Sequence, residues 1–324
     1  MIDRSEVARA VAVLREGGLV AFPTETVYGL GCDAESPPAL RHLFSVKGRP
    51  VDHPVIVHVA DAGAIEPFVV GVPPMARLLS EAFWPGPLTV VLRRSARIPD
   101  EVTGGRDTVG LRVPETPTAR ELLRAFGGAV AAPSANRFGK VSPTTAADVR
   151  ADLGADVDLV IDGGPCRVGV ESTIVDCTGT APAILRLGGV PRAAIEGVLD
   201  APVDLRTAGE TAAPGTLPGH YAPSARVMLV DQRAAAARAS GLLASGARVG
   251  LLALAPAPPE LPGGLHLLDQ PSDVDELARV LYTRLRDADR ADLDVLLVVP
   301  PASDGIGATI LDRLTRAAAG SPDR

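Results

Sequence analysis

The chain has 324 residues, of which 46% are hydrophobic and 22% charged, and its formal net charge is −7. A chain of this length forms about two domains, and this composition favours a buried core over disorder. No apolar run reaches about 18 residues, which argues against a membrane-spanning helix, and the negative charge argues against a protein that coats nucleic acid by bulk charge.

Cysteine and histidine usage narrows the class further. The three cysteines, Cys32, Cys166 and Cys177, show no CxxC spacing, and the five histidines show no HxxxH pair. We therefore expect neither a disulfide scaffold nor a dedicated protein metal site. The charged N-terminal stretch lacks a signal-peptide core, so we expect a reducing, cytoplasmic location.

Helix and strand patterns alternate over residues 1–200. A capping-box pattern at Asp3 and Glu6 starts the first helix, and Gly17-Gly18 ends it. Further helices are expected at 37–47, 74–83, 118–126 and 144–153. Strands are expected at 19–22, 54–60, 88–93, 108–113, 129–136, 159–164, 172–178 and 183–188. This alternation, with many apolar strands, predicts an α/β layered domain.

Residues 201–225 change character, because they are rich in Gly, Pro, Ala and Thr and lack periodicity. We interpret this segment as a linker that is too long for a mere connection. A functional lid and a disordered spacer both fit, and His220 with Tyr221 favours the lid. Residues 226–324 form a second, smaller βαβ unit with a parallel, Rossmann-like sheet. Its expected strands are 227–230, 248–254 and 293–300, and its expected helices are 232–244, 273–288 and 306–319.

Lysine and asparagine are rare. Only Lys47 and Lys140 stand among 32 basic residues, and Asn136 is the single asparagine. We interpret this as drift toward residues with G+C-rich codons, so the survivors are expected where arginine or another residue cannot substitute. Chance survival on the surface is the alternative for Asn136 and Lys140.

Polar clusters interrupt the ends of several expected strands. They lie at 23–31, 47–58, 109–114, 132–143 and 171–176, with Arg186 in a further strand. Lys47 and Arg49 suit a polyphosphate, as a point charge and a fork. Arg112 lies in an apolar strand and needs an anionic partner from the protein or a ligand. Gly29 and Gly31 would let the backbone approach a ligand. Since ligands gather at strand ends in open α/β sheets, we expect one shared cleft.

The motifs in this order resemble one family. The stretches FPTETVYGLG, KGRPVDHP, WPGPLTVVL, LRVP, PSANRFGKVSPT, ESTIVD, LRLGG and PGHYAPSA closely match the Sua5/YrdC/YciO family, and the last of them points to its longer Sua5-type branch. The resemblance implies a YrdC-like twisted mixed sheet and threonylcarbamoyl-AMP synthase activity. Members combine L-threonine, bicarbonate and ATP and release pyrophosphate. A separate transferase complex, a transient partner, then modifies adenosine 37 of ANN-decoding tRNAs.

The resemblance also implies roles for individual residues. ATP would be bound by Lys47, Arg49, His53, Ser134, Asn136, Ser142, Arg186 and Tyr221. Threonine and bicarbonate would be bound by Thr24, Thr26, His58, Arg112 and Ser172. His220 and Tyr221 would form the lid that excludes water from the adenylate. Mg²⁺ would be held through the ATP phosphates without dedicated protein ligands. Family members often carry asparagine where this chain has His53, and no residue is singled out as a general base.

Two other functions remain open at this point. The same basic cleft could serve an RNA-binding or ribosome-associated module, although the net acidity, the 3% aromatic content and the placement of polar residues at strand ends argue against stable nucleic-acid binding. An enzyme of the same fold with a different acceptor is the third interpretation, as the YciO branch of the family indicates. The linker and second domain favour the threonine enzyme.

Overall fold

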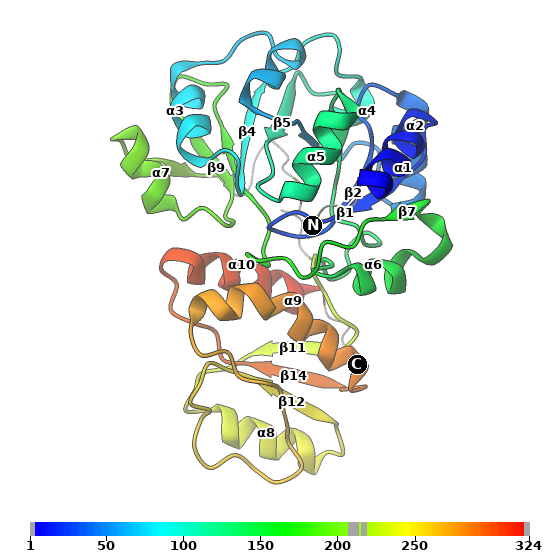
Figure 1. The fold of residues 1–324 in the computed structure, drawn as a ribbon. Helices are drawn as coiled ribbons and strands as arrows, with labels where there is room; N and C mark the ends of the chain where they lie inside the picture. Colours follow the sequence, from blue (N-terminus) through cyan, green and yellow to red (C-terminus); the bar gives the residue numbers. More distant parts are fainter. Residues whose placement is uncertain (1–3, 207–213, 215–218, 321–324) are drawn as a thin grey trace. The chain divides into compact units, whose positions relative to one another are not determined.

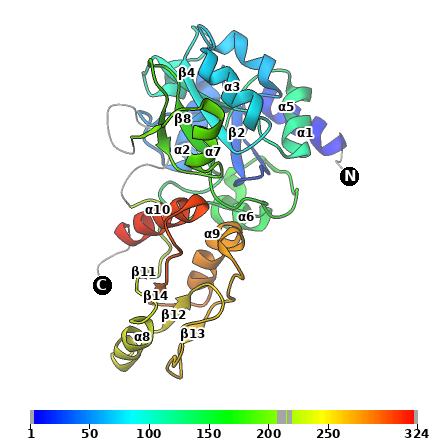
Figure 2. The ribbon, with the colours of Figure 1, turned by 90° about the vertical axis from the view of Figure 1, so that its left-hand side faces the viewer.

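The computed structural model describes residues 4–206, 214 and 219–320 and divides into two compact units (Figures 1 and 2). The first unit is Met1–Phe138 with Ser142–Thr216, and the second is Gly139–Val141 with Leu217–Arg324. Residues 207–213 and 215–218 of the linker expected at 201–225 lie outside the described residues, so that linker stays a prediction. A short segment from the N-terminal half of the chain, 139–141, belongs to the second unit.

The first unit is built on a ten-stranded mixed sheet, in the order β10-β9-β8-β4-β5-β3-β6-β2-β1-β7. Its strands are β1 (Val20–Phe22), β2 (Gly29–Asp33), β3 (Ile56–His58), β4 (Leu88–Arg93), β5 (Thr108–Arg112), β6 (Val130–Ala131), β7 (Leu159–Val160), β8 (Thr173–Asp176), β9 (Ala183–Arg186) and β10 (Asp204–Leu205). Because strands distant in sequence are neighbours in the sheet, the polar segments at their ends are brought together.

Helices of the first unit pack around this sheet (Figure 1). They are α1 (Arg4–Arg15), α2 (Pro37–Lys47), α3 (Pro74–Phe83), α4 (Asp100–Thr103), α5 (Pro117–Phe126), α6 (Ala146–Leu153) and α7 (Arg192–Leu199), with 3₁₀ turns η1 (Ala62–Phe68) and η2 (Gly154–Asp156). Leu14 of α1 and Leu122 of α5 join Phe22 and Val130 in one apolar cluster. A larger cluster, which includes Leu43 of α2, fills the main core.

The expected mixed α/β fold is confirmed, and every expected helix and strand is present, although several strands are shorter. The expected strand 129–136 keeps its pairing only over β6. Its continuation bonds irregularly beside β2, through Leu30 N to Pro133 O at 2.8 Å and Ala135 N to Tyr28 O at 2.8 Å. No strand was expected at β2. Packing requires glycine at position 31, since a Cβ there would lie 2.7 Å from side chains of Phe22 and Val130.

The second unit is a four-stranded parallel sheet in the order β11-β14-β12-β13. Its elements are β11 (Arg226–Leu229), α8 (Ala235–Ala244), β12 (Val249–Leu252), β13 (His266–Leu267), α9 (Val274–Arg290), β14 (Val295–Val298) and α10 (Gly305–Ala319). Figures 1 and 2 show α8 on one side of the strands and α9 with α10 on the other. The small parallel sheet expected from the sequence is thus confirmed. Among the described residues, no helix combines the length and apolarity needed to cross a membrane.

Candidate functional site

The central strands of the first sheet present different side chains on their two faces. Val57, Val90 and Leu111 point into the main core. Since side chains alternate along a strand, their neighbours occupy the opposite face. That face carries Ile56, His58, Thr89, Val91, Gly110 and Arg112, and β3 and β5 pair so that His58 stands beside Arg112. Alternation thus gathers the candidate polar residues on one face.

A small hollow of about 20 Å³, roughly the space for one water molecule, lies over these strands. Its lining is mostly apolar, with Ile56, Gly110 and Ile174 among its members, and includes Thr89 and Thr108. Glycine at position 110 leaves space beside Thr89, because a Cβ there would lie 3.2 Å from Thr89 Cγ2. The hollow offers an apolar surface next to a polar rim.

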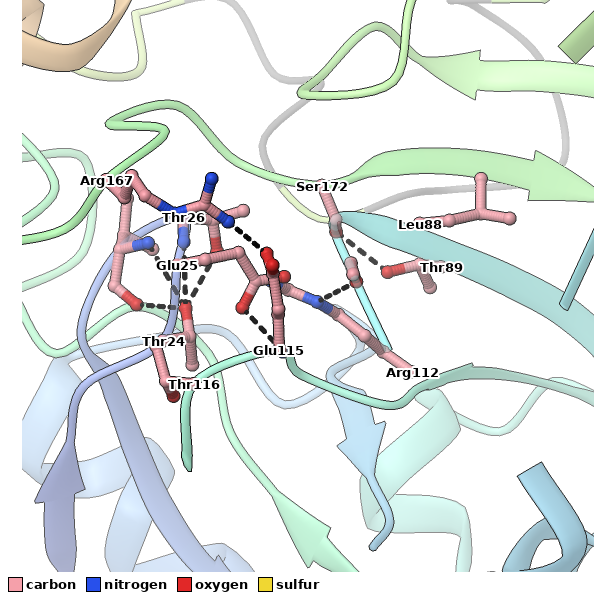
Figure 3. Close-up of polar contacts among 12 residues, drawn as sticks. Thr24, Glu25, Thr26, Leu88, Thr89, Arg112, Glu115, Thr116, Arg167 and Ser172 are labelled. Carbon is pink, nitrogen blue, oxygen red and sulfur yellow. Dashed lines mark hydrogen bonds and ion pairs between the residues drawn. The ribbon is translucent and has the colours of Figure 1, made fainter. Parts of the chain in front are cut away.

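Arg112 finds its anionic partner within the protein (Figure 3). Its Nη2 donates to Glu25 Oε1 at 2.6 Å, and its Nε donates to Gly86 O at 3.2 Å. Glu25 Oε2 also accepts a hydrogen bond from the backbone N–H of Glu115 at 2.9 Å. Arg112 and Glu25 are 4% and 1% exposed, so this is a buried ion pair. Of the two sources expected for an anionic partner of Arg112, the protein therefore supplies one.

The threonines of the 23–28 turn bond to one another. Thr24 Oγ1 lies 2.8 Å from Thr26 Oγ1 and donates to Val27 O at 2.6 Å (Figure 3). Both threonines are buried. The next aromatic residue, Tyr28, donates its hydroxyl to Gly164 O at 2.8 Å, which fastens the turn to the 163–164 loop. The turn that carries Thr24, Glu25 and Thr26 is therefore preorganised.

Ser172 connects two further candidates. Its hydroxyl lies 2.7 Å from Thr89 Oγ1, and Arg186 donates to Ser172 O through Nε at 3.1 Å and Nη2 at 2.8 Å. Arg186 Nη1 also reaches Pro214 O at 2.7 Å. The backbone packs tightly here, because a Cβ at Gly188 would lie 2.3 Å from Ser172 C. Ser172 and Arg186 therefore belong to one buried network.

Ser142 bonds to a buried carboxylate. Its Oγ donates to Glu171 Oε1 at 2.8 Å, and the two residues are 0% and 6% exposed. Glu171 immediately precedes Ser172 in the chain, so this contact joins the 132–143 cluster to the 171–176 cluster. Ser142 and Ser172 were expected at the site from the sequence, whereas Glu171, which joins their networks, was not.

Lys47 is 2% exposed and lies against the 134–136 backbone. Its Nζ donates to Ser134 O at 2.6 Å and to Asn136 O. Burial, followed by the nearby charge of Arg49, holds the pKa of Lys47 well below its usual value. Because an ammonium has three donors, two carbonyl contacts leave one donor for an anionic oxygen.

Arg49 and His53 both contact one aromatic ring. The Arg49 Cζ is 5.7 Å from the Phe138 ring centroid, and the His53 ring packs edge-on against Phe138 at 5.6 Å. Arg49 Nη2 donates to Pro54 O at 2.8 Å. Burial and then the charge of Arg49 lower the pKa of His53. Phe138 thus packs against both the Arg49 guanidinium and the His53 ring.

Two of the three rare residues are buried. Lys47 is 2% exposed and Asn136 is 1% exposed, and Asn136 Nδ2 donates to Arg137 O at 2.9 Å. Lys140 is exposed and belongs to the second unit. The burial of Lys47 and Asn136 fits the expectation that these residues stand where others cannot substitute. The exposure of Lys140 fits the alternative of chance survival on the surface.

His58 is buried beside Arg112 with its Nδ1 unbonded among the described residues. Burial, followed by the charge of Arg112, lowers the pKa of His58 to about 3. The imidazole is therefore neutral at pH 7 and presents a ring nitrogen to its surroundings.

His220 and Tyr221 belong to the second unit, where they are 7% and 1% exposed. Their rings pack edge to face with centroids 4.4 Å apart. Because the two units are described separately, the proposed lid position of this pair stays a prediction.

Four side chains at the site were missed from the sequence: Glu25, Thr89, Phe138 and Glu171. Glu25 and Phe138 lie inside the polar clusters at 23–31 and 132–143. A charged or an aromatic residue within such a cluster could have identified them as site residues. Thr89 stands in an apolar run, where strand alternation places it on the face of Arg112. Among the described residues, no group of three or more His, Cys, Asp or Glu side chains could hold a metal ion.

Both parts of the chain match profiles of known protein families. Residues 12–188 match a family profile described as "Telomere recombination" (Sua5_yciO_yrdC). Residues 190–319 match the profile described as "Threonylcarbamoyl-AMP synthase, C-terminal domain". The two profiles together account for nearly the whole chain.

Individual proteins are similar to this chain over nearly its whole length. The threonylcarbamoyl-AMP synthase of Pyrococcus abyssi is 38% identical over 98% of this chain and 95% of its own length. The Bacillus subtilis protein of the same name is 37% identical over 97% and 93%. The solved structure of P. abyssi Sua5 complexed with L-threonine superposes with a TM-score of 0.92, covering 99% of this chain and 96% of that one. This chain belongs to the Sua5/YrdC/YciO family and has the two-domain form that ends in the Sua5 C-terminal domain.

Proposed function

We propose that this chain is a threonylcarbamoyl-AMP synthase, a nucleotidyltransferase that forms threonylcarbamoyl-adenylate and pyrophosphate from ATP, L-threonine and bicarbonate. The observation that carries the proposal is a set of cations buried in a protein of net charge −7. Lys47, Arg49, Arg112 and Arg186 are 2%, 8%, 4% and 4% exposed. Cationic side chains bind phosphate and carboxylate groups strongly, so ATP and the two substrate carboxylates would be ligands for this set in addition to protein partners such as Glu25.

The reaction requires positioning and no covalent enzyme intermediate. Bicarbonate loses hydroxide to give CO₂, and the lone pair of the neutral threonine amine attacks its carbon. The nitrogen then loses a proton, which leaves with the hydroxide as water, and a carbamate remains. A carbamate oxygen then attacks the α-phosphorus of ATP in line, and pyrophosphate leaves with the electrons of the broken P–O bond. Catalysis follows from holding three reactants together and from stabilising charge.

The cluster around Lys47 is the proposed triphosphate site. Lys47 has one ammonium donor left after its two carbonyl contacts, and Arg49 offers a fork next to Phe138. Ser134, Asn136, Ser142 and Arg186 complete the proposed set of ATP ligands. Magnesium bound to the phosphates would neutralise their charge. In that arrangement the phosphate oxygens would supply the ligands, which are of the hard oxygen type that Mg²⁺ prefers.

The sheet face around Arg112 is the proposed threonine and bicarbonate site. Glu25 fixes the Arg112 guanidinium, which leaves part of its fork for a substrate carboxylate. Neutral His58 can bond to substrate without adding charge. Thr24, Thr26 and Ser172 offer hydroxyls held in place by protein partners.

The second unit would contribute His220 and Tyr221 as a lid. A mixed anhydride of this type hydrolyses readily, so excluding water preserves the product. The product would pass to a tRNA threonylcarbamoyl transferase complex in the cytoplasm, through a transient contact and without stable RNA binding by this chain.

A pyrophosphate assay with single omissions tests the function. The full chain is incubated with ATP, L-threonine and bicarbonate, and then with each substrate left out. Pyrophosphate release that needs all three supports the proposal. Pyrophosphate release that does not depend on threonine would indicate a different acceptor. Binding of RNA without any pyrophosphate release would indicate a binding module.

A further inference from the structure

Tyr221 is held inside the second unit by residues from two helices. Its ring stacks on Tyr282 of α9 at a centroid distance of 5.5 Å and an interplanar angle of 19°. The guanidinium carbon of Arg313, on α10, is 5.1 Å from the same ring. Stacking and cation–π contact therefore fix the orientation of the Tyr221 ring.

The backbone at this point is also constrained. Tyr221 has φ +64°, a left-handed conformation that is unusual for a bulky residue. Gly219 has φ +73°, and a Cβ on Gly320 would lie 2.7 Å from Gly219 Cα. Such conformations persist where surrounding contacts impose them, and they cluster at functional sites.

Arg313 is costly as a packing residue. It is 0% exposed and forms an ion pair with Asp312, which also accepts from Arg316 Nε at 3.1 Å. Burying a charge carries a desolvation penalty that an apolar residue of similar volume avoids. An arginine here points to a role beyond filling the core.

The same region holds a second backbone segment. Ala222 N donates to Gly139 O at 3.3 Å, and Arg286 Nη2 donates to Val141 O at 2.5 Å. Residues 139–141 lie in the chain between Asn136 and Ser142, both proposed ATP ligands. The second unit thus contains Tyr221 itself and residues 139–141, which lie in the chain between two proposed ATP ligands.

We propose that Arg313 and Tyr282 are positioning residues that keep Tyr221 in the one ring and backbone conformation the reaction uses. This inference rests on the proposed synthase function and gives the second unit a role in it. Neither residue is assigned a contact with substrate; both act through Tyr221.

The test compares Tyr282→Leu and Arg313→Met with the wild-type full chain. Threonylcarbamoyl-adenylate and pyrophosphate are measured in the same reaction, and ATP affinity is measured separately. We expect the ratio of intact adenylate to pyrophosphate to fall at least about threefold, because water reaches the anhydride, while ATP affinity changes less than about twofold. Tyr282→Phe keeps the stack and should retain the wild-type ratio.

Controls separate positioning from folding. Arg279→Met removes an exposed arginine of α9 that pairs with Glu276 and should leave the ratio unchanged. Thermal unfolding checks that each variant is folded, and Tyr282→Leu carries the test alone should Arg313→Met not fold. Unchanged ratios in folded variants overturn the inference. A wild-type chain that forms no adenylate overturns the proposed function instead.

A double variant tests whether the effect passes through Tyr221. Tyr221→Leu with Tyr282→Leu should show the same ratio as Tyr221→Leu alone, because a positioning residue has nothing left to position. An additive further loss in the double variant would show that Tyr282 acts independently of Tyr221 and would overturn the assignment.

Discussion

Glu25 Oε1 lies 2.6 Å from Arg112 Nη2, and both side chains are almost completely buried. The two residues are 87 positions apart in the chain. Their pairing neutralises an arginine at the centre of the proposed threonine site and holds its guanidinium in one orientation. It also means that removing Arg112 does more than remove a substrate contact.

Arg112→Lys is therefore the sharpest test of the threonine site. Lysine keeps a positive charge for Glu25 but lacks the planar fork that binds a carboxylate through two parallel bonds. We expect the KM for threonine to rise roughly tenfold or more, while the KM for ATP changes by less than about twofold. Steady-state kinetics with each substrate varied checks this. A selective rise in the KM for ATP would place the strand in the nucleotide site.

Removing the charge alone should destabilise the fold. Arg112→Leu leaves the Glu25 carboxylate buried and unpaired, which costs about 3–5 kcal/mol. Adding Glu25→Gln to Arg112→Leu removes the orphaned charge and should restore at least about half of that loss. The free energy of unfolding in denaturant, measured for both variants and both single changes, tests the pairing. Additive losses would show that the two side chains do not interact.

Lys47→Ala and Arg49→Ala should each weaken ATP binding. Each loses a charge-assisted contact worth about 1.5–3 kcal/mol, which is roughly tenfold to over a hundredfold in affinity. The other lysine offers a matched control, because Lys140 is exposed and Lys140→Ala should stay within about twofold of wild type. Calorimetric titration with ATP measures all three. Normal affinity in both Lys47→Ala and Arg49→Ala would place the triphosphate elsewhere.

His58 should make the fold sensitive to acid. Its pKa is about 3 in the folded chain and about 6.5 when unfolded, so between these values only the unfolded chain takes up the proton. Stability is therefore unaffected above pH 6.5 and falls as pH drops below it. At pH 5 the loss from this group is about 2 kcal/mol relative to pH 7. The drop between these pH values should be smaller by that amount in His58→Gln. An equal drop in both proteins would contradict a neutral, buried His58.

Local sequence patterns were sufficient for most of the fold. Strands such as β4 and helices such as α2 followed from apolar periodicity and from turn residues. The strand β2 was not predicted because its two glycines weaken the local strand pattern, and the packing of Phe22 and Val130 against Gly31 is a long-range contact that no local pattern shows. Short α7, with Gly197 inside it, offered too weak a helical pattern.

The site was predictable as a set of residues and not as a set of contacts. The clusters around Lys47, Arg112 and Ser172 stood out because polar residues broke apolar strands. Their partners depend on a sheet order in which β4 lies beside both β5 and β8, which no local pattern specifies. The contact of Thr89 with Ser172 follows from that order, and the pairing of Glu25 with Arg112 likewise joins residues 87 positions apart.

Mass spectrometry of the reaction product tests the central claim most directly. The full chain is incubated with ATP, L-threonine and ¹³C-labelled bicarbonate, and the nucleotide products are identified. The account predicts threonylcarbamoyl-adenylate that carries the label in its carbamoyl carbon, together with an equal amount of pyrophosphate. An unlabelled adenylate, or pyrophosphate release without any threonine-containing product, would contradict it.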